Sequence, residues 1–253
     1  MKCERIFLST IDDQAHSLAR TYGLGLEIAE YCTAWNMDEH LTETDALVKE
    51  KINGIPNRIL HGPFNELFPC AIDPLARKLA AQRFSQAIVI AEAYGVKKIV
   101  LHGGYNPQIY YPIWYTEQSV VFWSEFVQSV PEDMVLCLEN VLEEEPMMLL
   151  DIVRKVNDPR LQMCIDIGHV NAYSNISISE WIHTCATKIA HFHIHNNDGI
   201  ADTHNGLMDG TLQMSDVLQQ INRECPDATW TLECPDAESS VEWLLNLKEN
   251  TLL

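Results

Sequence analysis

Basic residues are scarce in this sequence. Of its 253 residues, 17 are Lys or Arg and 36 are Asp or Glu, which gives a formal net charge of -19. The 49 positions from Leu101 to Leu149 contain no Lys or Arg at all. Proteins that bind nucleic acids neutralise phosphates with basic side chains gathered on one face. The composition therefore argues against a nucleic-acid partner and leaves room only for a local basic site.

The sequence also lacks the marks of secreted, membrane-bound and multidomain proteins. None of its eight cysteines forms a C-x-x-C pair, so we expect reduced thiols in a cytosol. No apolar run reaches the roughly twenty residues that a membrane span requires. Internal repeats, low-complexity tracts and Pro/Gly/Ser-rich linkers are missing as well. We therefore expect a soluble, cytoplasmic protein without membrane contact, folded as a single domain over residues 1–253.

What the sequence does contain is an alternation of short β-rich runs and helix-period segments, repeated eight times. Most of the runs are continuous Val, Ile, Leu and Cys stretches, which are typical of parallel strands covered by helices. The runs are residues 5–8, 24–28, 58–61, 98–102, 134–139, 161–166, 189–195 and 229–233. Eight strand–helix pairs in about 250 residues predict an α/β fold, the (β/α)8 TIM barrel. A doubly wound open sheet is the alternative.

The clearest helix is predicted between the third and fourth runs. Asp73 is a suitable N-cap, Pro74 suits the first helical position, and Gly95 is placed to end the helix. An apolar stripe follows the helical period between them. It consists of Ala76, Ala80, Phe84, Ala87, Ile88 and Ala91.

Metal-binding or acid–base side chains stand at the ends of seven of the eight runs. They are Glu27, His61, His102, Glu139, Asp166 with His169, His193 or His195, and Glu233, while Asp202 and His204 follow in the loop after the seventh run. A TIM barrel gathers the C-terminal ends of its strands at one mouth, where its chemistry takes place. One such residue would be an ordinary turn cap, but seven at one mouth indicate a functional site.

The composition of this set predicts a bound cation. Four carboxylates converge with no Lys or Arg beside them, and they would raise one another's pKa unless cations lay among them. Imidazole and carboxylate ligands suit Zn²⁺, Mn²⁺, Fe²⁺ or Co²⁺. Cys137 and Cys164 share the strand parity of the two acidic residues that follow them, so their thiols should pack one layer deeper. Gly168 would let the chain turn sharply enough for both Asp166 and His169 to face the mouth.

The seventh run leaves a choice between three histidines. His191, His193 and His195 alternate along one face, so they should stack from the barrel interior to the mouth. Parity alone does not identify the ligand among them.

These residues and their surroundings resemble the xylose isomerase-like TIM barrels, a superfamily that includes endonuclease IV and many sugar and sugar phosphate isomerases and epimerases. The matching segments lie in the superfamily's order between residues 61 and 233. They are His61-Gly62-Pro63-Phe64, Leu101-His102-Gly103-Gly104-Tyr105, Leu138-Glu139-Asn140, Asp166-Ile167-Gly168-His169, His193-Ile194-His195-Asn196-Asn197-Asp198-Gly199, Asp202-Thr203-His204 and Leu232-Glu233. The seventh loop departs from the pattern, with residues 207–210 reading Leu-Met-Asp-Gly where Gly-Glu-Gly is usual.

The resemblance implies two metal arrangements. In members similar to the ketose epimerases, one metal is held by the equivalents of Glu139, Asp166, His193 and Glu233, and the two glutamates exchange a proton with substrate carbon through an enediolate. In members similar to endonuclease IV, a further metal lies on His61, His102 and Glu139 and a third on His169, Asp202 and His204. His193 is preferred to His195 because the superfamily's ligand is followed three positions on by Asp or Asn, here Asn196.

Aromatic residues crowd the segment after the fourth run, where they could wall a polyol pocket or pack on their own helix. We take Glu27, Phe64, His195, Tyr105 and Trp114 as candidate substrate-binding residues. The segment 30–51 after the second run, taken as a strand-end loop, carries six acidic residues against two lysines and is unsuited to holding DNA.

The leading hypothesis is a divalent-metal-dependent isomerase or epimerase of a small sugar, polyol or sugar phosphate. One to three ions of zinc or manganese would bind, and Glu139 and Glu233 would be the catalytic pair. The alternative is a two- or three-metal phosphoester hydrolase resembling endonuclease IV. A barrel that binds a sugar as a sensor is a third, non-enzymatic reading. The sequence leaves the identity of the sugar and the oligomeric state open.

Overall fold

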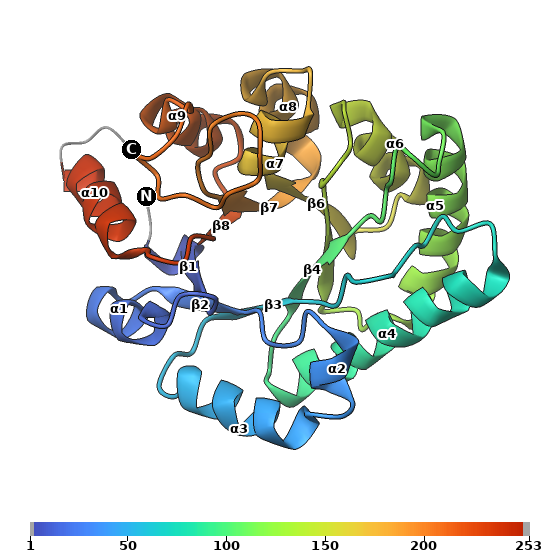
Figure 1. Cartoon of the computed structure of the whole chain (residues 1–253), viewed down its shortest axis with the longest axis horizontal. Helices are drawn as coiled ribbons and strands as arrows, with labels where there is room; N and C mark the ends of the chain where they lie inside the picture. Colours follow the sequence, from blue (N-terminus) through green and yellow to red (C-terminus); the bar gives the residue numbers. More distant parts are fainter. Residues whose placement is uncertain (1–2, 250–253) are drawn as a thin grey trace.

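Eight parallel strands close into a barrel in the computed structural model, which describes residues 3–249 (Figure 1). Each strand pairs with the next in chain order, and β8 pairs with β1 to close the ring. The strands are β1 (Ile6–Ser9), β2 (Gly25–Ile28), β3 (Arg58–His61), β4 (Lys98–His102), β5 (Val135–Glu139), β6 (Leu161–Asp166), β7 (Ile189–Ile194) and β8 (Thr229–Leu232). The eight predicted runs are thus confirmed to within a residue or two, and the open-sheet alternative is wrong.

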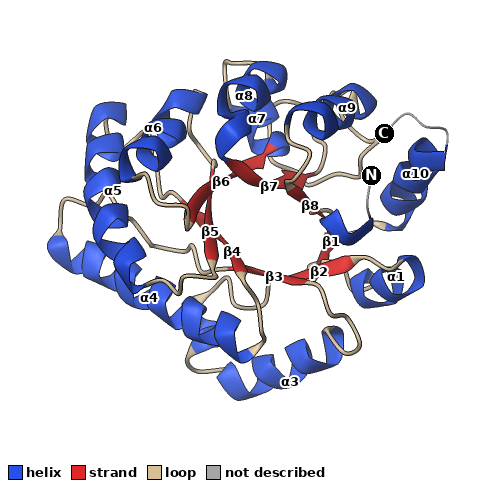
Figure 2. Cartoon of the chain, turned by 180° about the vertical axis from the view of Figure 1, so that it is seen from behind, coloured by secondary structure: helices blue, strands red, loops and turns tan. Residues whose placement is uncertain are grey.

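The helices surround the barrel as an outer ring, which Figure 2 shows from the opposite side. They are α1 (Ala15–Tyr22), α2 (Ala34–Met37), α3 (Leu41–Lys51), α4 (Pro74–Ala93), α5 (Pro112–Phe126), α6 (Pro146–Val156), α7 (Ile167–Tyr173), α8 (Ile178–Cys185), α9 (Met214–Glu224) and α10 (Glu238–Glu249). Short 3-10 turns lie at Cys3–Arg5, Val127–Ser129 and Ala186–Lys188. Over residues 3–249, none of the helices has the length and apolar character that crossing a bilayer demands.

Helix α4 forms for the reasons read from its sequence. The Asp73 side chain accepts a hydrogen bond of 2.8 Å from the Leu75 amide, and Pro74 opens the first turn. Ala80, Phe84 and the three apolar residues that follow them at the helical period are buried against the barrel. The helix ends before Gly95, whose φ of 68° turns the chain away.

The segment after β2 differs from its prediction. Residues 30–51 are predicted as a strand-end loop, but most of them form α2 and α3. Helix α3 belongs to the outer ring (Figure 1), so its acidic residues do not all face the mouth. The acidity of this segment therefore says less about the substrate than the sequence suggested.

The barrel interior is closed below the mouth by a small apolar layer. It consists of Phe7, Ile59, Val100, Cys137 and Cys164, all buried. Both thiols pack where strand parity placed them, and burial raises the pKa of Cys137 to about 11. The seven cysteines whose side chains the structure describes are free; the side chain of Cys3 lies outside the described residues. This layer lies below the strand ends that carry the predicted site residues.

Candidate metal centre

Four predicted ligands meet at the C-terminal ends of β5 to β8. Glu139, Asp166, His193 and Glu233 bring ligand atoms within 4.8 Å of one another, and all four are buried. His193 Nδ1 lies 3.0 Å from Glu139 Oε1, 3.0 Å from Glu233 Oε2 and 3.8 Å from Asp166 Oδ2. Because these strands are consecutive in the barrel, their last residues are neighbours at the rim. We call these four residues the central group.

Asp166 is held by the junction between β6 and α7. It caps the helix, with Oδ1 accepting a 2.7 Å hydrogen bond from the His169 amide. The Asn140 side chain binds both sides of the Asp166 backbone, accepting from its amide at 2.9 Å and donating to its carbonyl at 3.1 Å. Strand and helix therefore present Asp166 and His169 to the same mouth.

Gly168 serves this junction differently from the prediction. A Cβ at this position would overlap the His195 ring, and Gly168 does not take a left-handed φ. Its role is close approach of the chain to His195 and not the sharp turn that the sequence suggested.

A second predicted trio forms beside the central group. His169 Nε2 and His204 Nε2 lie 3.1 Å and 3.0 Å from the same atom, Asp202 Oδ2. His204 takes a left-handed φ of 48°, a conformation that non-glycine residues adopt at a cost and that is common at functional sites. The loop that carries Asp202 and His204 is pinned by two hydrogen bonds between the backbones of Asn196 and Asn205.

The third predicted set is only partly reproduced. His61 Nε2 and His102 Nε2 both reach Glu139 Oε2, at 3.5 Å and 3.3 Å. His61, Glu139 and His193 provide ligand atoms that lie within 4.8 Å of one another, and His102 is not part of this group. The ring of Phe64 stacks on His102 with centroids 4.4 Å apart. His102 therefore lies at the edge of this set.

The histidines around these groups are oriented as metal ligands are. His61, His169 and His204 each place Nδ1 within 2.8–2.9 Å of a main-chain carbonyl, of Gly62, Asn140 and Glu233 respectively. A carbonyl only accepts, so Nδ1 carries the proton, and Nε2 of each ring faces the carboxylates. Histidines that bind metals are held in this way by their second ring nitrogen.

The pKa values of Glu139 and Asp166 are not raised, because positive charge lies among these carboxylates. Burial raises the pKa of Glu139, but the imidazoles of His193 and His102 overcome it and hold the pKa well below its usual range. The pKa of Asp166 falls to about 2 for the same reason, with His169 and His195 opposing the effect of burial. The prediction counted only Lys and Arg as cations. Protonated histidines supply positive charge among the carboxylates when metal is absent.

Unpaired buried atoms show that the histidines do not satisfy the site by themselves. Glu139 Oε2, Asp202 Oδ1 and His195 Nδ1 are buried at the mouth without a partner in hydrogen-bond geometry. The imidazoles near Glu139 Oε2 lie 3.3 Å and 3.5 Å away and form ion-pair contacts with it. In the described part of the chain, only three other buried side-chain nitrogen or oxygen atoms lack a hydrogen-bond partner. A buried carboxylate oxygen without a donor is costly. Oxygen and imidazole donors with spare coordinating atoms fit a divalent metal such as Zn²⁺ or Mn²⁺.

The paired histidines predict how stability depends on pH after metal removal. Burial lowers the pKa of His204, but Asp202 overcomes this effect and raises it to about 9 from 6.5. Protonated His204 therefore stabilises the fold fully below pH 6.5, and this contribution is lost as the pH rises towards 9. We expect the melting temperature of chelator-treated protein to fall across this range. Scanning calorimetry should show a smaller fall for Asp202→Asn, and equal falls would contradict the assignment.

Three of the predicted substrate-binding residues are buried. Glu27 and His195 are 1% and 0% exposed, and Tyr105 packs against Tyr115 at 6% exposure. Glu27 accepts hydrogen bonds below the central group, and His195 Nε2 lies 3.1 Å from both oxygens of Asp166. Glu27 and His195 thus contact residues of the central group, and the contact of these three side chains with substrate stays a prediction.

The other two predicted substrate-binding residues are more exposed. Phe64 is half-buried and stacks at the mouth, as a wall residue would. Trp114 is 36% exposed, and its indole N–H donates to the Cys70 carbonyl at 2.9 Å. Trp114 therefore joins the start of α5 to the segment after β3.

Several polar residues around the site were not selected from the sequence. Glu143, 2% exposed, accepts a 2.6 Å hydrogen bond from the Tyr115 hydroxyl, and burial raises its pKa. His191 lies below His193, and burial lowers its pKa to about 4, so its ring is neutral. The period of two along β7 marked His191 as inward-facing. No pattern along the chain indicated the partners of Glu143 or His191, which come from other strands and helices.

The chain is similar to known proteins in sequence. A family model described as xylose isomerase-like TIM barrel matches residues 18–249. An uncharacterised protein of Methanocaldococcus jannaschii is 28% identical over 202 residues, which cover 76% of this chain and 69% of that protein.

Solved structures share the fold over nearly the whole chain. A D-tagatose 3-epimerase-like protein superposes with a TM-score of 0.76 at 23% identity, covering 97% of this chain and 96% of that one. The TTHB071 protein from Thermus thermophilus, in crystals soaked with zinc chloride, gives a TM-score of 0.75 at 22% identity, covering 97% and 98%. Sugar epimerases are among the further matches.

Proposed function

This chain belongs to the xylose isomerase-like TIM barrels, and we propose that it is a divalent-metal-dependent isomerase or epimerase of a small sugar, polyol or sugar phosphate. The observation that carries the proposal is the position of two buried glutamates. Glu139 Oε1 and Glu233 Oε2 each lie 3.0 Å from His193 Nδ1. Two carboxylates thus converge on one point at the floor of the mouth. The sugar epimerases among the structural neighbours support this reaction class.

The central group supplies the ligands and the bases of this reaction. Glu139, Asp166, His193 and Glu233 would hold the metal, which when bound would polarise a substrate carbonyl and a neighbouring hydroxyl. Neighbouring imidazoles, His193 foremost, offset burial and lower the pKa of both glutamates, so both are ionised at neutral pH. Each can therefore accept a proton from substrate carbon, and once protonated it can return the proton.

The rim around the central group suits a polyol. His102, Asp202 and His204 are partly exposed, with side-chain exposures of 18%, 19% and 28%, and they offer donors and acceptors to hydroxyl groups. Phe64 adds an apolar wall beside His102. A compact, hydroxyl-rich ligand is the class that these side chains would bind.

A paired assay tests this function. We expect the metal-loaded protein to catalyse deuterium exchange from solvent into a member of a ketose panel, because proton transfer at carbon is the proposed step. A duplex with an abasic site is the parallel substrate, and we expect no incision. Cleavage of that duplex at enzyme-like rates without exchange into any ketose would overturn the proposal.

The His169–Asp202–His204 trio favours one second candidate, a phosphoester hydrolase with two or three metals. A single-metal isomerase does not need this trio, whereas a hydrolase would use it to hold a further ion. The metal content after native purification separates the two. Three tightly bound zinc ions per chain would favour the hydrolase, and one exchangeable manganese or cobalt ion would favour the isomerase.

A further inference from the structure

The buried carboxylate of Asp12 links the segment after β1 to the segment after β8. Asp12 follows β1 and is 3% exposed. Its Oδ2 accepts a hydrogen bond of 3.0 Å from the amide of Ala237, the residue before α10. Its Oδ1 accepts one of 2.8 Å from the Gln14 amide. A carboxylate of the chain itself thus lies at the N-terminus of the helix that follows β8.

This place often holds a substrate phosphate in (β/α)8 barrels. The phosphate lies at the loops after the seventh and eighth strands, on main-chain amides at a helix N-terminus. In this chain Asp12 occupies the Ala237 amide, and Glu238 adds a second carboxylate in the first turn of α10. The positive end of this helix is therefore already matched by negative charge, and a phosphate would meet like charge there.

Other amides at the mouth are also held by carboxylates of the chain. In the loop after β7, Asp198 Oδ1 accepts hydrogen bonds of 2.9 Å and 3.0 Å from the amides of Ile200 and Ala201. Helices α4 and α7 begin in the same way, with Asp73 and Asp166 each accepting a hydrogen bond from an amide of the first turn. The amides that an external anion would need are thus engaged internally.

The loops that follow the strands, which we call the mouth loops, are acidic as a group. Together their 64 residues include 15 Asp or Glu and no Lys or Arg. They are residues 10–14, 29–33, 38–40, 62–73, 103–111, 140–145, 195–213 and 233–237. A phosphate at the mouth would therefore lie among carboxylates, without a basic side chain from these loops to neutralise it.

In the described part of the chain, three basic side chains reach the mouth loops from the helices, and each is already engaged. Lys51 Nζ lies 2.9 Å from Glu30 Oε1 and also donates to a main-chain carbonyl. Arg83 pairs with Asp38 at 2.7 Å. Arg77 donates to main-chain carbonyls of the loop after β3. These cations balance groups of the chain and are not left to bind a phosphate.

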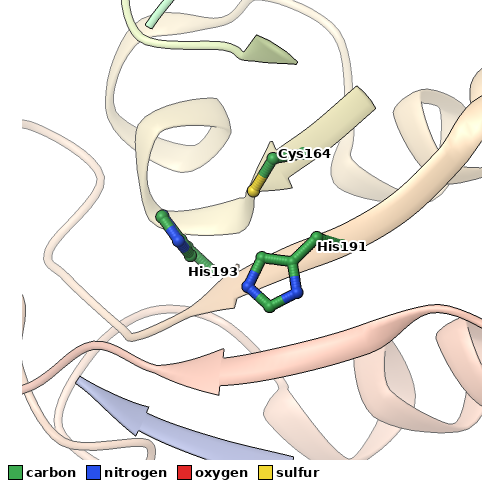
Figure 3. A group of neighbouring side chains, drawn as sticks. All are labelled: Cys164, His191 and His193. Atoms are coloured by element: carbon green, nitrogen blue, oxygen red, sulfur yellow. The ribbon is translucent and has the colours of Figure 1, made fainter. Parts of the chain in front are cut away.

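The barrel interior next to the central group brings no ammonium group to the mouth either. Figure 3 shows the side chains of Cys164, His191 and His193, which are 0% exposed and have ligand atoms within 4.8 Å of one another. Lys98, the first residue of β4, lies at the opposite end of the barrel. Its Nζ donates to Thr229 Oγ1 at 2.7 Å and to a main-chain carbonyl at 2.8 Å.

A single bound metal would not reverse this charge balance. Imidazoles that bind a metal do so in their neutral form. The three carboxylates of the central group, Glu139, Asp166 and Glu233, carry more negative charge than one divalent ion carries positive charge. In the single-metal form of the proposed function, the surroundings of the substrate therefore stay negative.

We propose that Asp12 is a specificity-determining residue whose carboxylate excludes a substrate phosphate, so that the site takes an uncharged sugar or polyol. This inference rests on the proposed function and narrows its substrate class. The hydroxyl groups of a free sugar can donate hydrogen bonds to the carboxylates of the mouth. A phosphate group offers them acceptor oxygens and a charge of about -2 instead.

Paired substrates test the proposal in the deuterium exchange assay. The pairs are fructose, tagatose and psicose, each with its 6-phosphate. For each ketose that exchanges, we expect its ester to have a kcat/KM at least about 10-fold lower, mainly through KM, because repulsion acts on binding. High salt should shrink this difference, since the screening length falls to about 3 Å at 1 M salt. A difference that does not depend on salt, or a preference for the esters, would overturn the proposal.

Two variants that each remove one charge locate the effect. Asp12→Asn keeps an acceptor for the Ala237 amide, and Asp236→Asn changes an exposed residue of the same loop, so it decides if Asp12→Asn does not fold. We expect each to narrow the ratio of ketose to ester activity by about 3- to 10-fold. Asp227→Asn is the matched control at the N-terminal end of β8 and should keep the wild-type ratio. A purely structural role would lower both activities equally, and an unchanged ratio in the folded variants would overturn the assignment.

Inorganic phosphate separates this inference from the proposed function. We expect low millimolar phosphate to leave the melting temperature of the metal-loaded protein where chloride of the same ionic strength leaves it. If neither ketoses nor esters exchange, the proposed function fails, and this measurement decides the inference. Stabilisation by phosphate would overturn the inference whether or not exchange occurs. Exchange into esters as fast as into free ketoses would overturn it while the proposed function stands.

Discussion

Replacing Glu139 with glutamine is expected to lower the rate of substrate proton exchange by about 10²–10⁴-fold, the usual contribution of a positioned acid–base group. Glu139 has two parts in the proposed chemistry, as a metal ligand and as a proton acceptor. Glutamine keeps the size of the side chain but loses the charge and the basic oxygen. Steady-state exchange, measured as kcat/KM with saturating metal, gives the size of the effect.

The control for this variant is Glu92→Gln, the same substitution on the exposed outer helix α4. We expect wild-type activity from it. The barrel of Glu139→Gln should remain folded, because the glutamine still fills the buried position and no strand contact is removed. Exchange within a few-fold of wild type in Glu139→Gln would show that the central group is not the active site.

Removing the metal is expected to abolish exchange and to lower the melting temperature by about 5–10 °C. A ligand present at about 100 times its dissociation constant stabilises the folded state by about 2.7 kcal/mol. Each kcal/mol shifts the melting temperature of a protein of this size by about 2–4 °C. Calorimetry of the protein before and after chelator treatment measures the shift, and added Zn²⁺ or Mn²⁺ should reverse it.

The Glu139→Gln variant also serves as the control for the thermal shift. It lacks a ligand, so chelator should change its melting temperature much less than that of wild type. The same shift in both proteins would mean that the metal binds elsewhere. Full activity in the presence of chelator would reject a metal-dependent reaction.

The fold and the convergence of four candidate ligands could be predicted from the sequence because both follow from order along the chain. Parallel strands with short connections end at the same rim, so a residue at the end of a strand must lie near the mouth. Glu139 and Asp166 end β5 and β6, His193 is the last residue but one of β7, and Glu233 follows β8 directly. The structure brings these four side chains together. No distance between strands was needed for this prediction.

The depth of each side chain could not be predicted in the same way. Glu27 is the last residue but one of its run, whereas His61 ends its own, and Glu27 pairs across the sheet with Ile59, a residue of the apolar layer below the mouth. It therefore lies lower than His61, among His191, His193 and Thr231. The relative stagger of barrel strands sets this depth, and strand periodicity does not reveal stagger.

By itself the sequence determined the eight-fold alternation of strands and helices and the types of side chain at the strand ends. The hydrophobic period and the order of elements can be read along the chain. They suffice to predict the barrel fold and to place the candidate site at the C-terminal ends of its strands. Only the tertiary structure decided which imidazoles pair with which carboxylates, and hence the charge of each group. It also decided that Asp12, beyond β1, binds the amide of Ala237, beyond β8. Such contacts depend on how far each strand is shifted against its neighbours when the barrel closes.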